Sequence, residues 1–365
     1  MQRSHNNSIF KSMLSSTDKS HRESATFSEV VGQAKVLVLF VCLVVLTFLT
    51  LVGNTLVCRT VYSTRRFHKP GFYFVVSLSV ADFLVGLLVM PVSTAYYVTF
   101  AMTGKWIFGI ALCDAWSLAN LWFCIASIFS LCAVTWDRYV AIKSPLHYSL
   151  RMRTKQVTRL IVAIWLTSFI AALLNCYGLK TSPTRILCEV QGIPLQYTIL
   201  DFILVYLFPL TTIVFVNIFI AKAVSGQLKR VQQQYIPRSI NDVVEMGQIS
   251  NTDFASNPPN VRAPGFNLGK ERNIKHEIKT FRTFLIVTGS FFVSWSPFFF
   301  ILLVDPISKV DGNIMYICVI LTYINSASNP LVYGIFNETS GRQCLQVLKI
   351  ADVQLFNDLG FLCQV

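Results

Sequence analysis

The sequence predicts an all-α membrane protein, a seven-transmembrane helix bundle followed by a short amphipathic eighth helix. Hydrophobic residues make up 53% of the chain and charged residues only 13%, whereas a soluble protein would carry about a quarter charged residues. Seven apolar segments are each long enough to cross a hydrocarbon layer of about 30 Å. They lack the alternation of apolar and polar residues that a membrane barrel needs.

Each apolar segment is expected to be a helix, because lipid cannot satisfy an open backbone. The segments cover approximately residues 35–60, 71–98, 110–136, 157–179, 195–222, 281–304 and 312–335. They define a seven-transmembrane domain over residues 35–336. Residues 1–34 are a polar tail without a signal-peptide pattern, so we expect the first span to insert by itself.

Basic residues in the short loops predict the orientation. They follow spans one and three, which places these loops in the cytoplasm. The N-terminus is then extracellular, and the protein is a multi-pass protein of the plasma membrane. The formal net charge of +13 is explained by this topology and by anionic lipid, so we expect no nucleic-acid partner. The loop residues concerned are Arg65, Arg66, Lys69, Lys143, Arg151, Arg153 and Lys155.

The segments outside the spans carry weaker signals. Residues from about 227 to 270 are polar and contain prolines, which predicts a mostly disordered cytoplasmic loop. Residues 337–365 are the cytoplasmic end, and 337–350 have the apolar spacing of a helix on the membrane surface. Cys344 in that helix is either palmitoylated or idle. Asn6 begins an acceptor triplet for glycosylation.

Two of the ten cysteines lie on the outer side of the membrane. Cys113 is at the outer start of span three, and Cys188 is in the loop after span four. Since both face an oxidising compartment, we expect a disulfide between them.

Ionisable residues inside the spans are few, and at that depth each is costly. Asp82 lies in span two, Asp137 and Arg138 lie at the inner end of span three, and Asp201 lies in span five within "YTILDFILVYLFP". Such residues are functional candidates by default.

Short motifs on successive spans add to this picture. In their order and placement the chain resembles the rhodopsin-like (class A) G-protein-coupled receptors, and it is closest in pattern to biogenic-amine, trace-amine and histamine receptors. The resemblance covers roughly residues 35–345. The motifs are "GN" (53–54), "VAD" (80–82), "WIFG" (106–109), "DRYVAI" (137–142), Trp165, Pro209, "FFVSWSP" (291–297) and "NSASNPLVY" (325–333).

The resemblance implies an activation switch and a heterotrimeric G protein as partner, with arrestin and membrane lipid as further partners. Arg138 would pair with Asp137 and with Glu277, and so hold the cytoplasmic ends of spans three and six together at rest. The alternative is that two interfacial charges simply reach water. The residues implied in the switch are Asp137, Arg138, Tyr139, Glu277, Pro209, Ile128, Phe291, Asn329, Pro330 and Tyr333.

The resemblance also implies an allosteric sodium ion, and no other cofactor. Oxygen atoms around one carboxylate are apt ligands for such an ion. The alternative is a satisfied polar network that holds no ion. The matching positions are Asp82, Ser127, Asn325, Ser326 and Asn329.

The ligand site departs from the amine-receptor pattern. Asn120 stands where those receptors carry the span-three aspartate that binds the ammonium group. Asp201 lies eight residues before Pro209, about 12 Å outward along an α-helix, at the depth where the resemblance places the pocket. We therefore expect Asp201 to be the countercharge of a cationic amine; the alternative is a carboxylate that reaches interfacial water. The implied site comprises Asp201, Asn120, Cys124, Trp295, Phe298, Phe299 and Tyr323.

Other classes of function fit less well. A membrane metalloenzyme needs clustered ligands, yet all five histidines lie outside the spans, so we expect no enzyme. A transporter is expected to show paired halves, and no such repeat is found. A receptor for a non-amine small molecule or a short peptide remains the second hypothesis.

Overall fold

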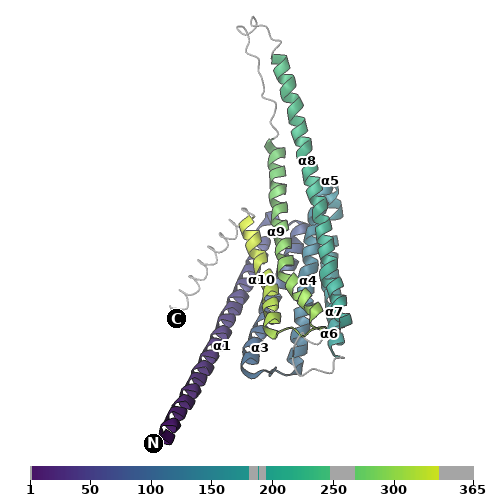
Figure 1. The fold of residues 1–365 in the computed structure, drawn as a ribbon. Helices are drawn as coiled ribbons and strands as arrows, with labels where there is room; N and C mark the ends of the chain where they lie inside the picture. Colours follow the sequence, from purple (N-terminus) through teal and green to yellow (C-terminus); the bar gives the residue numbers. More distant parts are fainter. Residues whose placement is uncertain (1, 181–187, 189–194, 247–267, 337–365) are drawn as a thin grey trace, which may run out of the picture.

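The computed structural model describes residues 2–180, 188, 195–246 and 268–336, and the elements in this part of the chain are helices arranged as an elongated bundle (Figure 1). The α-helices are α1 (Gln2–Ser63), α2 (Pro70–Leu84), α3 (Met90–Thr103), α4 (Ile110–Lys143), α5 (Pro145–Arg151), α6 (Thr154–Lys180), α7 (Leu195–Asp201), α8 (Phe208–Met246), α9 (Leu268–Val304) and α10 (Gly312–Phe336). Three short segments differ in winding: the 3₁₀ segment η1 (Arg65–Phe67) and the π segments η2 (Val85–Val89) and η3 (Phe202–Leu207).

The predicted all-α membrane fold is confirmed, and the helices cover the predicted spans. Within the described residues, six stretches are long and apolar enough to cross a membrane: 32–63, 70–103, 110–143, 154–176, 195–226 and 285–304. The seventh helix is α10, which packs against α9 and α1. It carries two asparagines and two serines within 325–329.

The spans bury one side and present large apolar residues on the other. The largest buried cluster joins four helices through residues such as Leu78, Ile128, Ile213 and Phe291. Meanwhile Val293 is 76% exposed within α9. Large exposed apolar patches are a liability in water, but they suit a surface that faces lipid.

Both π segments directly precede a helix that has proline in its first turn. The segment η2 leads into α3 with Pro91 at its start, and η3 leads into α8 with the buried Pro209. Proline lacks an N–H, and its ring clashes with the carbonyl four residues earlier. A wider turn before the proline relieves this clash. Residues outward of η2 and η3 are therefore rotated relative to a continuous α-helix.

Two predicted segments differ from the structure. The helix α8 continues to Met246 and α9 begins at Leu268, so a large part of the predicted disordered loop 227–270 is helical. Residues 227–236 contain neither glycine nor proline and are rich in good helix formers. The helix α1 already begins at Gln2, because residues 2–31 also lack glycine and proline. The predicted surface helix at 337–350 with Cys344, and the side chain of Asn6, lie outside the described residues.

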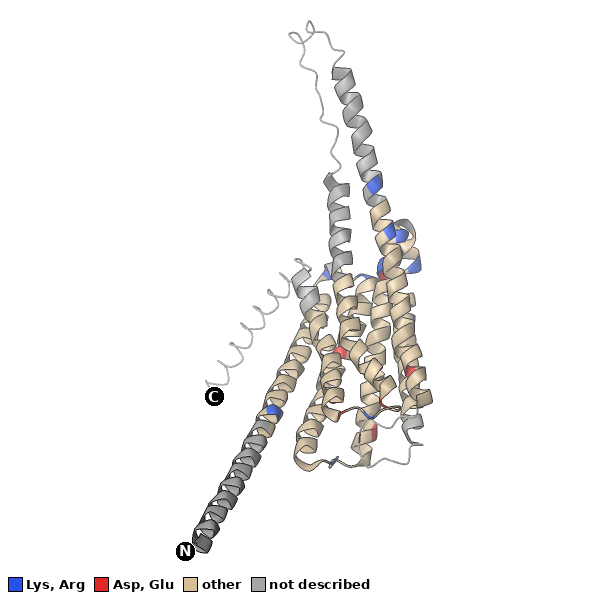
Figure 2. Ribbon diagram, in the orientation of Figure 1, with Lys and Arg blue, Asp and Glu red and all other residues tan. Residues whose placement is uncertain are grey.

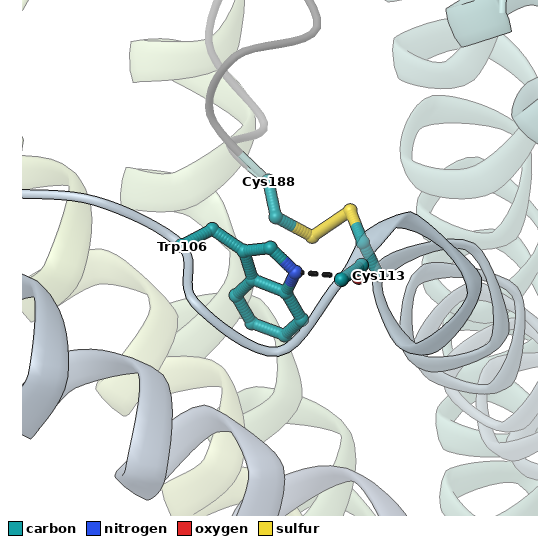
Figure 3. The surroundings of a disulfide bond; sticks show 4 residues. Trp106, Cys113 and Cys188 are labelled. Atoms are coloured by element: carbon teal, nitrogen blue, oxygen red, sulfur yellow. Dashed lines mark hydrogen bonds between the residues drawn. A yellow bond between two sulfur atoms is a disulfide. The ribbon is translucent and has the colours of Figure 1, made fainter.

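The predicted disulfide ties Cys188 to the bundle. Cys113 of α4 is bonded to Cys188, with the two Cα atoms 5.8 Å apart. Beside it, the indole Nε1 of Trp106 donates to the carbonyl of Gly109 over 2.7 Å (Figure 3). The prediction of this disulfide is confirmed.

Candidate functional site

A fully buried carboxylate joins three helices of the bundle. Asp82 of α2 is 0% exposed. The hydroxyls of Ser127 in α4 and Ser326 in α10 donate to its Oδ1 over 3.0 and 2.9 Å. The Nδ2 of Asn329 in α10 donates to Oδ2 over 2.7 Å. A carboxylate this far from water needs such partners, because an isolated buried charge is very costly.

Three asparagines add acceptor oxygens to this region. Each of Asn54, Asn325 and Asn329 has a buried Oδ1 without a hydrogen-bond partner among the described residues. Asn54 belongs to the same network, since its Nδ2 donates to the carbonyl of Ser326 over 3.1 Å. Carboxylate, hydroxyl and amide oxygens are the ligands that hard cations prefer. The residues of the predicted sodium set therefore fit such an ion; Asn54 was not predicted.

A second buried carboxylate lies at the inner end of α4. Asp137 is 0% exposed and forms an ion pair with its neighbour Arg138, whose Nε lies 3.0 Å from Oδ2. The hydroxyl of Tyr148 in α5 donates to the other oxygen, Oδ1, over 2.7 Å. Burial and the neighbouring carboxylate of Asp137 raise the pKa of Tyr148. The Tyr148 hydroxyl therefore keeps its proton and acts as a donor.

Other predicted switch residues are placed only in part. The half-buried Tyr139 accepts a hydrogen bond from Lys143 over 2.7 Å at its hydroxyl. Pro330 of α10 lies against Gly53 of α1, where an added Cβ would come within 2.9 Å of the proline ring. The side chains of Glu277 and Tyr333 lie outside the described residues, so the predicted pairing of Arg138 with Glu277 stays a prediction.

Aromatic side chains of α9 form the floor of the predicted ligand site. The ring centroid of Trp295 lies 5.9 Å from that of Phe291, 5.7 Å from Phe299 and 6.1 Å from Phe298. Phe291 shares its buried cluster with Ile128 of α4, and both side chains are 1% exposed. The structure thus brings together the aromatic residues that the sequence placed in the ligand site and in the switch.

Cys124 connects this aromatic cluster to a second one. Its thiol donates to the Oδ1 of Asn120 over 3.5 Å, one turn earlier in α4. Cys124 also packs against a cluster that contains Tyr323 of α10. Tyr323 is 2% exposed, and its hydroxyl donates to Ser93 of α3 over 3.1 Å. Tyr323 is therefore anchored toward α3 by a partner that was not predicted.

Asp201 directly precedes Phe202, which packs against the aromatic cluster, and the Asp201 side chain is hydrogen-bonded to α6. It is half-buried at the end of α7, and the side-chain amide of Asn175 in α6 donates a hydrogen bond to its carboxylate. The amide Nδ2 of Asn175 also donates to the carbonyl of Ala171 over 3.0 Å. The next residue, Phe202, has its ring centroid 6.4 Å from that of Phe299. Nothing local in the sequence singles out Asn175 as the partner of Asp201.

One bond between spans five and six was also not predicted. The hydroxyl of Tyr206 in η3 lies 2.6 Å from the hydroxyl of Ser296 in α9. Tyr206 is 4% exposed, and its ring centroid lies 4.9 Å from that of Phe299. The motif "FFVSWSP" contains Ser296, but it gives no indication of a partner in span five.

Comparisons with known proteins agree with this arrangement. Residues 53–333 match the family described as 7 transmembrane receptor (rhodopsin family). The chain is 32% identical to the 5-hydroxytryptamine receptor 1B of Vulpes vulpes over 328 residues, which cover 82% of this chain and 83% of that receptor. The Homo sapiens receptor 1B is 31% identical over 328 residues, with the same coverage. The Mus musculus receptor 1B is 32% identical over 324 residues, which cover 81% and 83% of the two chains.

Proposed function

Because this chain belongs to the rhodopsin family of seven-transmembrane receptors, we propose that it binds a cationic amine, holds it through Asp201 and activates heterotrimeric G proteins. Family membership implies a receptor with a small-molecule ligand and a G-protein partner, and not an enzyme. The identity of the ligand and the role of Asp201 are the proposal.

The observation that carries the proposal is the half-buried carboxylate of Asp201, whose chain neighbour Phe202 has its ring centroid 6.4 Å from that of Phe299 in the aromatic cluster of α9. A cation that leaves water needs a countercharge and is attracted by aromatic faces. Asn120 offers only a neutral amide, and its Oδ1 already accepts from Cys124. Asp201 is an acidic residue whose neighbour Phe202 packs against the aromatic cluster.

The relatives support an amine over the second candidate, a non-amine small molecule or short peptide. The matched proteins from fox, human and mouse are all 5-hydroxytryptamine receptors by name.

Charge distribution supports an N-terminus outside the cell. Figure 2 shows the basic residues gathered at the end of the bundle from which α8 and α9 project, which is the pattern of a cytoplasmic face.

The test is a panel of amines, beginning with 5-hydroxytryptamine, read as GTP exchange in membranes that contain the receptor. We expect Asp201→Asn to weaken the effective amine by at least about 1.5 kcal/mol, or about tenfold in potency, because a charged hydrogen bond is lost. If Asn120→Asp restores potency or changes which amine is most potent, span three contains a latent amine site.

A matched control removes an acid that is not in the site. Asp311 is exposed and accepts from the backbone N–H of Asn313 over 2.7 Å, and Asp311→Asn retains that acceptor while removing a charge. If Asp201→Asn and Asp311→Asn change potency equally, the effect is general attraction of cations. If Asp201→Asn leaves potency unchanged, the countercharge assignment is wrong.

We further propose that the cluster around Asp82 holds an allosteric sodium ion. When bound, the ion would supply a positive charge to the buried carboxylate of Asp82. The residues that would bind it are Asp82, Ser127, Asn325, Ser326 and Asn329. The test compares thermal unfolding in sodium chloride with unfolding in choline chloride. We expect sodium to stabilise the wild-type receptor and to have no effect on Asp82→Asn; equal curves for the wild type in both salts would argue against the site.

A further inference from the structure

The bond between Tyr206 and Ser296 has a defined proton order. The Ser296 hydroxyl donates to the backbone carbonyl of Phe292, one turn earlier in α9. A serine hydroxyl carries one proton. Tyr206 is therefore the donor across the 2.6 Å contact, and the hydrogen bonds run from the Tyr206 hydroxyl through Ser296 to the backbone of α9.

Ser296, which accepts the hydrogen bond from Tyr206, lies where α9 has lost a backbone hydrogen bond. Pro297 follows Ser296 directly and lies inside the helix. It lacks an N–H, so the carbonyl of Val293 loses its helical partner. A serine hydroxyl bonded to the carbonyl four residues earlier also favours bending. The side chain that crosses from span five thus attaches to α9 at the turn where this helix bends most easily.

Tyr206, which donates the hydrogen bond, lies at an irregular turn of the backbone. Tyr206 lies in the π segment η3, just before Pro209. Its ring is surrounded by aromatic rings, with centroid distances of 5.4 Å to Phe202 and 4.9 Å to Phe299. A tyrosine hydroxyl in such apolar surroundings needs a partner. Loss of Ser296 would therefore leave the Tyr206 hydroxyl without a bond.

We propose that Tyr206 and Ser296 form a latch between spans five and six, which holds α9 in the resting arrangement and opens when the receptor is activated. The inference rests on the proposed receptor function and adds a switching element to it. The latch adjoins the ligand wall on one side, because Tyr206 packs on Phe299, and the bending point of α9 on the other. In the same structure Arg138 is paired with Asp137, as expected of a receptor at rest.

The test is a double-mutant cycle of Tyr206→Phe and Ser296→Ala without ligand. Tyr206→Phe keeps the ring and removes only the hydroxyl. We expect each variant to raise basal GTP exchange per receptor about threefold, the typical effect of an interhelical hydrogen bond in a membrane. The double variant should match the larger single effect. Unchanged or lowered basal exchange, or a double variant at the roughly ninefold product of the two effects, would overturn the latch.

A control and a second measurement complete the design. Ser290 of α9 donates to the carbonyl of Val287 over 2.8 Å within its own helix. Ser290→Ala therefore measures the effect of removing a serine hydroxyl that is bonded within α9. The same cycle measured as thermal unfolding in detergent needs no G protein. We expect lower midpoints for both single variants and no further loss in the double; additive losses would mean that the two hydroxyls act independently.

The two measurements separate failure of the latch from failure of the receptor function. If neither the wild-type protein nor any variant stimulates GTP exchange on any class of G protein, the proposed function is wrong and the role in activation falls with it. The thermal cycle then still decides whether the bond joins the two helices. If the wild type stimulates exchange and the variants do not differ from it, only the latch is wrong.

Discussion

Replacing Tyr148 by phenylalanine removes one hydroxyl and leaves the ring in place. The ring packs against an apolar cluster that contains Phe74 and Val157, and this packing is unchanged in the variant. What the variant loses is the 2.7 Å hydrogen bond to the Oδ1 of Asp137 and the hydrogen bond that the hydroxyl accepts from the backbone of Gly71. This perturbation isolates the contribution of one hydroxyl, and the buried charged acceptor Asp137 dominates it.

The size of the effect follows from the acceptor. Asp137 is 0% exposed, and Arg138 bonds its other oxygen, Oδ2. Without Tyr148, Oδ1 loses its described partner in a place that water hardly reaches. Hydrogen bonds to charged groups contribute about 1.5–3 kcal/mol, and a buried group left unsatisfied costs a similar amount. We expect Tyr148→Phe to lower the free energy of unfolding by about 1.5–3 kcal/mol.

The assay is unfolding of purified wild-type and variant receptors in the same detergent at several pH values. Burial and the Asp137 carboxylate raise the pKa of Tyr148 above the ordinary value of 10.0. A raised pKa means that the contribution is fully present below the unfolded-state pKa and is lost as pH rises through the folded-state pKa. The difference between the two proteins should therefore be constant between about pH 6 and about pH 9.

Two results would refute this reasoning. One is a Tyr148→Phe receptor within about 0.5 kcal/mol of the wild type, the range of an ordinary surface substitution. The other is a difference that already disappears between about pH 8 and about pH 9. Tyr62→Phe is the control, because the Tyr62 side chain is 85% exposed and its hydroxyl should contribute little.

Three further predictions concern packing and the disulfide. A Cβ at Gly71 would collide with the ion pair of Asp137 and Arg138, so Gly71→Ala should lower the free energy of unfolding by about 1–3 kcal/mol. Gly289→Ala is the control in the same unfolding assay, because nothing lies within 4 Å of the added atom. A Cβ at Gly53 would lie 2.9 Å from the ring of Pro330, and Gly53→Ala should cost about as much, whereas wild-type stability would show that α1 and α10 can separate freely. Replacing both Cys113 and Cys188 by serine removes a disulfide that closes a sequence separation of 75 residues, and should lower the free energy of unfolding by about 2–5 kcal/mol. The double variant should also melt at the same temperature with and without reducing agent.

Four of the seven helix starts were predictable to within one residue because lipid imposes them, whereas α1, α6 and α9 begin earlier than predicted, at Gln2, Thr154 and Leu268. The predicted spans begin at 71, 110, 195 and 312, and the helices begin at Pro70, Ile110, Leu195 and Gly312. Charged or turn-forming residues mark these boundaries, and a span cannot shift without placing them in hydrocarbon. The helical extensions of α1 and α8 were missed because polar composition was interpreted as lack of structure, although residues 227–236 are rich in good helix formers and residues 2–31 lack glycine and proline.

The polar residues of the site were predictable, but their partners were not. A carboxylate in an apolar run stands out by its cost, as Asp82 and Asp201 do. The amide of Asn175 and the hydroxyl of Tyr206 are ordinary side chains in their own helices. They become partners only when helices far apart in the sequence pack together. The π turn at η3 adds to this difficulty, because it changes the face on which Asp201 and Tyr206 lie relative to an α-helical count.

The two π turns also make the outer halves of spans two and five adjustable in length. Each wide turn holds one residue more than an α-helical turn would need, so deleting one residue from η2 or η3 can restore regular winding without breaking the span. Deletion anywhere else in these spans would instead rotate every outward side chain by about 100° away from its partners. Loss of single residues during divergence is thus expected to concentrate at 85–89 and 202–207, where it would leave the helical segments on both sides of the π turn in register.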